Sequence, residues 1–431
     1  MKPSPLKKKK TMNKKIGNLF KGDKGIWMVF LFLCLISVVE VFSASSTLTY
    51  KSQNYLSPLI YHSGMILFGL FVAIVTLNIP CRYFKIVTPL MLFISFATLL
   101  WVLIGGESIN GANRVIKLAG FTFQPSEIAK GTMVLATAQI LSAMQRPDGK
   151  GADEKAMKYV MFIVLPAVFL IGIENLSTAA LLSMVIFLMM FLGRVPIMQL
   201  GKLMGAGVIV IGVFLTLVLT LGTIEQVEDE KNPPTEQAAA QGNKDEIKGG
   251  GVFHRFATWR NRILNHSGGE DVPADKYDID KNFQVGHANI AIASSGIIGK
   301  GPGNSTERDF LPQAFSDFIY AIIIEEMGII GAVAVVLLYV ILLFRTARIA
   351  RRCENNFPAF LVMGLALMLV IQATINMMVA VELMPVTGQP LPLISKGGTS
   401  TIINCAYIGV ILSVSRSAKR VDTATANNNE E

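Results

Sequence analysis

Charged residues are scarce in this chain. Of its 431 residues only 16% are Asp, Glu, Lys or Arg, whereas 52% are hydrophobic. This composition is too apolar for a soluble domain of the same length, because such a domain must leave more polar groups at its surface. A soluble protein with a very large helical core is the alternative. It is disfavoured because apolar runs of about 20 residues recur, each long enough to cross a hydrocarbon core about 30 Å thick.

Cysteine and histidine are also rare, with four residues of each. Cys34 and Cys405 fall inside apolar runs and Cys81 and Cys353 in short basic loops, so we expect no disulfide framework. The histidines show no ligand spacing, and the sequence therefore predicts no metal site built from side chains. A small-residue cleavage site is missing behind the first apolar run, so we expect that run to be retained as a membrane span.

The apolar runs predict an all-α polytopic membrane protein with ten transmembrane helices. We expect these helices over residues 25–44, 61–79, 86–105, 125–144, 159–173, 177–192, 204–223, 317–344, 358–381 and 399–415. A long extracytoplasmic loop, 224–316, separates helices 7 and 8. The other divisions are a basic tail over 1–24, helices 1–7 over 25–223, helices 8–10 over 317–415 and a C-terminal tail over 416–431.

Lysine and arginine are distributed unevenly between the spans. They are concentrated in the N-terminal tail, in alternate connections and after the last span. The positive-inside rule therefore predicts that both termini are cytoplasmic and that the chain lies in the cytoplasmic (inner) membrane. Membrane orientation thus accounts for the net charge of +9, and we expect no nucleic-acid partner. The basic tail is interpreted as a tether to the lipid surface.

The loop over 224–316 is too long to be a plain connection. Its first part, 228–250, is polar and of low complexity, and we interpret it as a flexible insert because it cannot bury enough apolar surface to become ordered. Its second part, 283–299, alternates apolar and small residues. This pattern predicts a short helix at the membrane interface.

One stretch, 301–328 (GPGNSTERDFLPQAFSDFIYAIIIEEMG), leads from a glycine-bearing loop into an apolar run. Asp317 stands at the junction, and the ordinary interpretation is a helix cap favoured by the helix dipole. Glu325 and Glu326 lie inside the run, where a charge costs at least ~2.5 kcal/mol, so such acids are functional candidates. On one continuous helix they lie ~12–13 Å beyond Asp317. We expect them to face a cavity or a partner rather than lipid, and to bind substrate.

A second polar stretch, 111–130 (GANRVIKLAGFTFQPSEIAK), contains a basic cluster. Arg114 and Lys117 share a face if they lie on a helical turn. Glu127 follows a proline at a predicted helix start, and Lys130 lies about one turn inside the span. Lys130 can simply extend its amine towards water. The functional alternative is a basic cluster that holds a phosphorylated ligand and balances the acids of the eighth span.

The third stretch, 384–400 (MPVTGQPLPLISKGGTS), is rich in proline and glycine and cannot form a regular helix. Such backbone is tolerated at membrane depth only if it is buried in protein or lines a wet cavity. An ordinary loop is one interpretation. The other is a binding segment in which Ser395, Lys396 and the backbone amides near Gly397 and Gly398 hold an anion.

Together these stretches resemble the SEDS family (shape, elongation, division and sporulation), whose members are polytopic membrane glycosyltransferases that polymerise peptidoglycan. The resemblance covers roughly residues 25–420, includes the ten spans and the long outer loop, and is closer to the division branch than to the rod-shape branch. The family's essential aspartate, which follows an LP motif, matches Asp317. The other matching residues are Arg114, Gln124, Pro125, Glu127, Lys130, Pro385, Gly388, Pro390, Pro392, Ser395, Gly397 and Gly398.

The resemblance implies that lipid II is both donor and acceptor in septal cell-wall synthesis during cell division. It also implies a class B penicillin-binding protein and other divisome membrane proteins as partners. Asp317 is then the base that activates the acceptor hydroxyl. The leaving diphosphate needs positive charge from the basic residues above or from a divalent cation. Two rival functions are a flippase for lipid-linked precursors and a non-enzymatic scaffold for a penicillin-binding protein.

The chain departs from the family pattern at several positions. Phe315 and Ser316 precede the aspartate where the family usually has His-Thr, and Lys396 replaces a usual tyrosine. The family's QPDLGT motif in the fifth span is replaced here by IENLST, so that its acid becomes Asn175, with Glu174 adjacent. A role for that acid cannot be carried over to this chain.

Overall fold

The computed structural model describes residues 21–45, 57–109, 112–118, 121–149, 151–231, 259–260, 283–311 and 314–427. The tail before residue 21 and the predicted insert from residue 232 onwards lie outside the described residues. The first residues assigned to that insert, 228–231, are not a loop but the end of a helix. The predicted C-terminal tail is likewise helical as far as residue 427.

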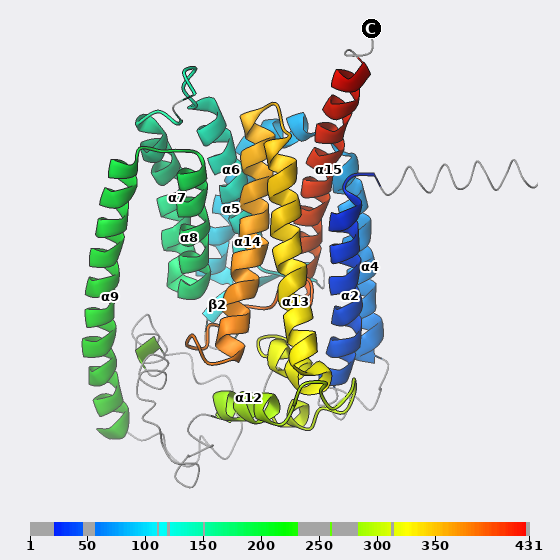
Figure 1. The fold of residues 1–431 in the computed structure, drawn as a ribbon. Coiled ribbons are helices and arrows are strands. Elements are labelled where there is room, and N and C mark those ends of the chain that lie inside the picture. Colours follow the sequence, from blue (N-terminus) through cyan, green and yellow to red (C-terminus); the bar gives the residue numbers. More distant parts are fainter. Residues whose placement is uncertain are drawn as a thin grey trace, which may run out of the picture.

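A bundle of long helices forms most of the described structure (Figure 1). Its ten members are α2 (Lys24–Ala44), α4 (Ser57–Asn78), α5 (Cys81–Gly105), α6 (Pro125–Ala143), α7 (Lys155–Glu174), α8 (Leu176–Leu192), α9 (Ile197–Lys231), α13 (Ile319–Arg351), α14 (Asn356–Ala380) and α15 (Thr399–Asn427). Eight of them are long and apolar enough to cross a membrane; α8 is apolar but shorter, and α6 contains buried charges. The predicted polytopic, all-helical membrane fold is confirmed.

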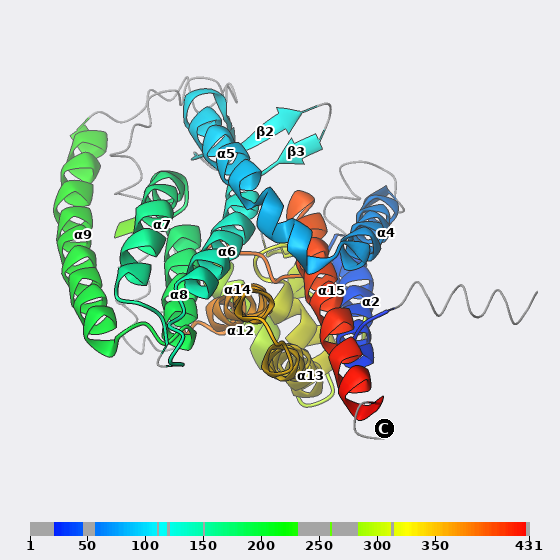
Figure 2. The same cartoon turned by 90° about the horizontal axis from the view of Figure 1, so that it is seen from above.

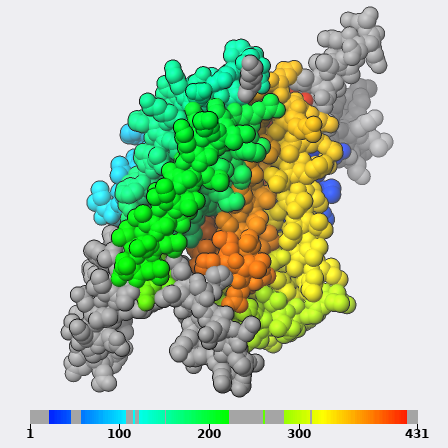
Figure 3. Space-filling model, turned by 60° about the vertical axis from the view of Figure 1, so that its left-hand side comes forward, coloured from blue at the N-terminus to red at the C-terminus, as the bar shows by residue number. Residues whose placement is uncertain are grey.

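The centre of the bundle is α14, which packs against α13, α6, α8 and α15 (Figure 2). Its inward positions are mostly leucine, methionine, alanine and valine, with two amide residues, Gln372 and Asn376, among them. These side chains and those of the surrounding helices form one continuous apolar core. By contrast, α9 stands at the edge of the bundle and packs mainly on α8 (Figures 1 and 3). Only 6% of the residues in its apolar part are buried.

The two ends of the bundle differ. One end, called here the terminal end, carries the start of α2 and the last turns of α13 and α15 (Figure 1). The opposite end, called here the loop end, carries the short helix α12 (Phe283–Ala293), the 3₁₀ turn η1 (Glu307–Asp309) and the irregular segment 381–398. The helix α12 lies within 283–299, where the sequence predicted a short helix.

A small antiparallel sheet at the loop end was not predicted. It consists of β1 (Glu107–Ile109), β2 (Ala112–Leu118) and β3 (Phe121–Phe123), in the order β1-β2-β3. Arg114 and Lys117 therefore lie on a strand, and the helical turn expected for them is wrong. Because side chains alternate along a strand, two residues three apart do not share a face. Their side chains are outside the described part of the structure.

The helix α13 is broken at Gly328, whose backbone (φ 68°, ψ −169°) is not helical. A side chain at Gly328 would clash with the carbonyl oxygen of Ile297, so the segment 296–301 approaches the break only because the residue is glycine. The break leaves backbone carbonyl groups of α13 without helical partners, and this segment supplies donors for them. Lys300 N donates to Glu325 O (2.9 Å), and Gly301 N donates to Glu326 O (2.8 Å).

The part of α13 before the break turns back towards the part after it. The hydroxyl of Tyr320 donates to the carbonyl oxygen of Ala332, 3.3 Å away. On one continuous helix these residues would be ~18 Å apart along the axis. The predicted straight helix from Asp317 to 344 is therefore wrong, and with it the axial separation expected between Asp317 and the two glutamates.

Candidate active site

Asp317 lies just before α13 and is half-buried. The residue at the N-cap position of α13 is Phe318, without a side-chain capping bond, so the interpretation of Asp317 as an ordinary helix cap is wrong. The carboxylate of Asp317 accepts a hydrogen bond from the hydroxyl of Ser316 (3.1 Å). The backbone carbonyl of Asp317 accepts one from the side-chain amide of Asn376 (2.8 Å). The residue is thus positioned through its backbone.

The segment 381–398 wraps around the residues that precede Asp317. The hydroxyl of Ser395 donates to the carbonyl oxygen of Ser316 (2.6 Å), and the backbone amide of Lys396 donates to Phe315 O (3.0 Å). On the other side of Asp317, a Cβ atom at Gly388 (φ 69°) would lie 3.7 Å from the Asp317 carboxylate. The structure therefore brings the third polar stretch into direct contact with the first.

The amine of Lys396 lies over the ring of Phe315, 5.0 Å from its centroid. Partial burial lowers the pKa of Lys396 below the usual lysine value, because burial disfavours the charged amine. A tyrosine at the family position could not supply this charge. Lys396 therefore places a cation on the same short segment as Ser395 and next to the residues that lead to Asp317.

Two buried amide side chains on α14 connect all three stretches, and the sequence analysis missed both. Gln372 accepts from the amine of Lys130 (2.8 Å) and donates to Pro390 O (3.0 Å). One turn further on, Asn376 donates to Asp317 O and to Gln389 O (2.7 Å). A pair of amide residues four apart in an otherwise apolar helix was the available signal, because such residues face one neighbour.

Lys130 is fully buried, so the interpretation that it extends towards water is wrong. Its amine forms an ion pair with Glu127 (2.8 Å), and the Glu127 carbonyl oxygen accepts from the hydroxyl of Tyr407 (2.9 Å). The second carboxylate oxygen of Glu127 has no hydrogen-bond partner among the described residues. In this arrangement the charges of α6 compensate each other and join α6 to α14 and α15. That Lys130 and Glu127 bind substrate stays a prediction.

Glu325 and Glu326 are fully buried and hold the loop that precedes them in sequence. Glu325 pairs with the amine of Lys300 (2.6 Å) and accepts from the hydroxyl of Ser305 and from the backbone amide of Thr306 (3.0 Å). The polar partners of Glu326 are Ser43 Oγ, Gly303 N (2.9 Å), Ser305 N (3.2 Å) and the guanidinium of Arg308 (4.0 Å). As expected, these acids do not face lipid, because the loop over residues 300–308 surrounds them. That they bind substrate stays a prediction.

Gly397 and Gly398 lie at the start of α15. The hydroxyl and backbone amide of Ser400 bond back to the carbonyl oxygen of Gly397 (2.9 and 3.0 Å). Nothing would meet a side chain at Gly398, which therefore borders open space, and its positive φ of 50° favours glycine. The start of a helix is a favourable place for an anion. Anion binding by these glycines nevertheless stays a prediction.

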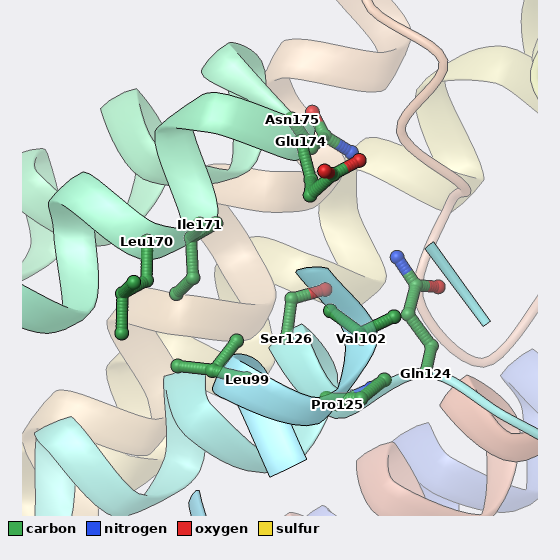
Figure 4. Close-up of a pocket in the computed structure, with 9 residues that line it drawn as sticks. All are labelled: Leu99, Val102, Gln124, Pro125, Ser126, Leu170, Ile171, Glu174 and Asn175. Carbon is green, nitrogen blue, oxygen red and sulfur yellow. The ribbon is translucent and has the colours of Figure 1, made fainter. Parts of the chain in front are cut away.

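A narrow pocket with a cavity volume of about 10 Å³ opens at the loop end between α5, α6, α7 and α8 (Figure 4). Its lining residues are Leu99, Val102, Gln124, Pro125, Ser126, Leu170, Ile171, Glu174 and Asn175. Asn175 caps α8 by accepting from Thr178 N (3.2 Å), and the hydroxyl of Thr178 accepts from the side chain of Gln389 (2.7 Å). The pocket is thus linked through two hydrogen bonds, by way of Thr178, to the segment that contacts Asp317.

Within the described residues there is no group of three or more His, Cys, Asp and Glu side chains that could hold a metal ion. The divalent cation considered above is therefore not assigned to ligands. Arg114, at the loop end on β2, and Lys117 cannot be placed relative to Asp317, because their side chains are not described.

A family model described as a cell cycle protein (FtsW/RodA/SpoVE) matches residues 23–243 and 250–420. Among curated relatives, a "probable peptidoglycan glycosyltransferase FtsW" of Halomonas elongata is 28% identical over 414 residues, with 94% of this chain and 93% of the relative covered. The "peptidoglycan glycosyltransferase MrdB" of Escherichia coli K12 is 25% identical over 394 residues, with 91% and 93% covered.

Two solved structures share the fold. A chain of a peptidoglycan synthase complex that coordinates polymerization and crosslinking matches with a TM-score of 0.64 and 24% identity, covering 93% of this chain and 99% of that one. The rod shape determining protein RodA of Thermus thermophilus matches with a TM-score of 0.60 and 23% identity, covering 93% and 98%. At this identity the similarity concerns the fold.

Proposed function

This chain belongs to the FtsW/RodA/SpoVE family of cell cycle proteins, and we propose that it is a peptidoglycan glycosyltransferase in which Asp317 is the catalytic base. It polymerises lipid II into glycan strands at the membrane face formed by the loop end. The observation that carries this proposal is that Asp317 is held by backbone contacts beside Gly388 and the segment bearing Lys396. Half-buried between these elements, its carboxylate can meet a substrate at the membrane surface.

The proposed reaction needs a single carboxylate. The acceptor sugar hydroxyl attacks the anomeric carbon of the lipid-linked sugar and gives up its proton to Asp317. The leaving diphosphate needs no proton, so a second acid is unnecessary. A single displacement inverts the anomeric centre, as in glycosidases whose carboxylate activates the nucleophile.

The departing diphosphate is stabilised by positive charge on the same face. Lys396 carries such a charge, and a backbone hydrogen bond connects it to the residues before Asp317 (Lys396 N to Phe315 O, 3.0 Å). Lys130 instead lies in a closed ion pair with Glu127 and holds the first polar stretch in place. We therefore assign Lys396 to the leaving group and Lys130 to positioning.

Cell division and a crosslinking partner are further parts of the proposal. Relatives named FtsW match over 90% or more of this chain, which supports a role in septal synthesis. A chain of similar fold belongs to a synthase complex that coordinates polymerization and crosslinking. This supports a class B penicillin-binding protein as partner. The arginine-rich end of α13 supports a cytoplasmic terminal end.

The test is polymerisation of fluorescent lipid II by the purified chain, with and without its penicillin-binding partner. Asp317→Asn should lower the rate by about 10²–10⁴-fold, which is the usual contribution of a general base. Asp309→Asn removes an acid on η1 of the same loop end and is the matched control, with an unchanged rate expected. If the penicillin-binding partner polymerised lipid II by itself and the chain alone did not, the chain would be a scaffold. Lipid transport by the chain without polymerisation would identify it as a flippase.

A further inference from the structure

A polar pocket lies at the terminal end, at the end of the bundle opposite Asp317. It is formed where the start of α2 meets the last turns of α13 and the middle of α15, and its cavity volume is about 210 Å³. The residues that line it are Asp23, Lys24, Arg345, Ile349, Arg352, Ser415 and Ala418. Three cations and one acid thus face a common space, and the glycosyltransferase reaction uses none of them.

The three cations line one pocket, and two of them lie on the same face of α13. Arg345, Ile349 and Arg352 are four and three residues apart, so they share one face of α13. Neighbouring arginines on the same turns, such as Arg351, do not line the pocket. Ile349 and Ala418 are nearly fully buried and give the pocket an apolar wall. The arrangement therefore combines two guanidinium groups with an apolar surface.

The single acid of the pocket is already engaged. Asp23 caps α2 by accepting from the backbone amides of Gly25 (2.8 Å) and Ile26 (3.1 Å) through the same carboxylate oxygen. That oxygen also lies 3.7 Å from Nε of Arg345. Asp23 can neutralise only one of the three positive charges, so the residues that line the pocket carry more positive than negative charge.

The guanidinium of Arg345 is held in place by the backbone of α2. It lies directly against Gly25, and a Cβ atom at that position would clash with the guanidinium nitrogens. Only glycine in the first turn of α2 leaves room for this contact. The guanidinium is the flexible end of a side chain that is 34% exposed, so its contacts with Gly25 and with Asp23 place it beside α2.

We propose that this pocket binds the phosphate group of an anionic phospholipid. Arginine pairs with phosphate through two parallel hydrogen bonds, and its guanidinium is easier to desolvate than an amine. Basic pockets between transmembrane helices at the cytoplasmic side bind anionic headgroups. The apolar wall formed by Ile349 and Ala418 favours a lipid over free phosphate. The lipid would tie α2, α13 and α15 together at the terminal end.

The experiment measures the thermal unfolding of the purified full chain in a neutral detergent, titrated with phosphatidylglycerol, phosphatidylcholine or inorganic phosphate. A ligand that binds the folded state raises the melting temperature. We expect stabilisation by phosphatidylglycerol. Arg345→Gln and Arg352→Gln should each raise the phosphatidylglycerol concentration needed by about fivefold, since each cation contributes about 1 kcal/mol to an anionic lipid. Arg351→Gln is the matched control and should leave the titration unchanged.

Gly25→Ala gives a test that changes no charge. It displaces Arg345 and should weaken the effect of phosphatidylglycerol as Arg345→Gln does. Equal titrations for the wild type and the three pocket variants would overturn the proposal, as would equal stabilisation by phosphatidylcholine. Stabilisation by inorganic phosphate without any by phosphatidylglycerol would overturn the assignment to a lipid.

Discussion

The two ends of the helix bundle handle charge in opposite ways. At the loop end, Glu127, Glu325 and Glu326 are almost completely buried, and each is paired with a lysine or an arginine. At the terminal end the helices end regularly, and arginines such as Arg351 and Arg352 are exposed. Buried charges need partners, whereas exposed ones are solvated. The three buried glutamates therefore hold the fold together, whereas the exposed arginines of the terminal end are accessible to ligands.

Asp317 differs from these three glutamates. It is half-buried, while the other three acids are 2% exposed or less. The contacts that position it go through its backbone carbonyl and the residues before it. We therefore expect the loss of its carboxylate to reduce activity far more than stability.

The largest effect on stability is expected for Lys130→Met. Removing the lysine leaves Glu127 charged and buried without its partner, at a cost of about 3–5 kcal/mol. The double variant Glu127→Leu/Lys130→Met should recover most of this loss, because two apolar side chains replace the pair. Thermal unfolding in detergent measures both. A single variant as stable as the wild type would show that the loop end tolerates unpaired charge as the terminal end does.

A smaller loss is expected for Gly328→Ala. The residue has a positive φ, and an added methyl group would meet the backbone of Ile297. Strain of this kind costs about 1–3 kcal/mol. Gly212→Ala on α9, where nothing would meet the added methyl, is the control and should not destabilise. If the two variants unfolded at the same temperature, the break in α13 would not be specified by Gly328.

The charge of Lys396 can be tested through the pH dependence of polymerisation rather than through stability. Burial lowers the pKa of Lys396, so its positive charge is present at low pH and is lost at a lower pH than that of an ordinary lysine. We expect polymerisation to fall on the alkaline side as this charge disappears. Lys396→Arg should extend the active range to higher pH, because arginine stays charged. Identical pH–rate profiles would remove Lys396 from the stabilisation of the leaving group.

The smallest effect is expected for Arg352→Gln without added lipid. Arg352 is exposed, and surface substitutions usually change stability by less than about 0.5 kcal/mol. Thermal unfolding of the lipid-free protein should not distinguish this variant from the wild type. A loss comparable to that of Lys130→Met would place a structural charge at the terminal end as well, and the contrast between the two ends would be lost.

The helical fold was predictable because most of the spans are long apolar runs and the others contain only one to a few charged residues. The short helix within 283–299 was predictable for a similar reason, since its pattern of apolar and small residues is local. The three polar stretches could also be recognised as neighbours of the membrane surface, since proline, glycine and buried charge do not belong inside a span. These features follow from composition and local pattern.

What could not be predicted depends on contacts between distant segments. The strand β2 contains Arg114 and Lys117 because it pairs with its neighbours, and pairing leaves little trace in a short sequence. The break at Gly328 exists because the segment 296–301 packs there, so a helical pattern alone indicated a continuous helix. Gln372 and Asn376 looked like isolated polar residues until their partners on α6 and on the segment 381–398 were known.

The central claim is that the Asp317 carboxylate is the base that activates the acceptor sugar. The most direct measurement compares lipid II polymerisation by the wild-type chain and by Asp317→Asn, each with its penicillin-binding partner and each shown to unfold at the same temperature. We expect the variant to remain folded and its rate of glycan synthesis to fall by about 10²–10⁴-fold. Glycan chains formed by the folded variant at the wild-type rate would contradict it.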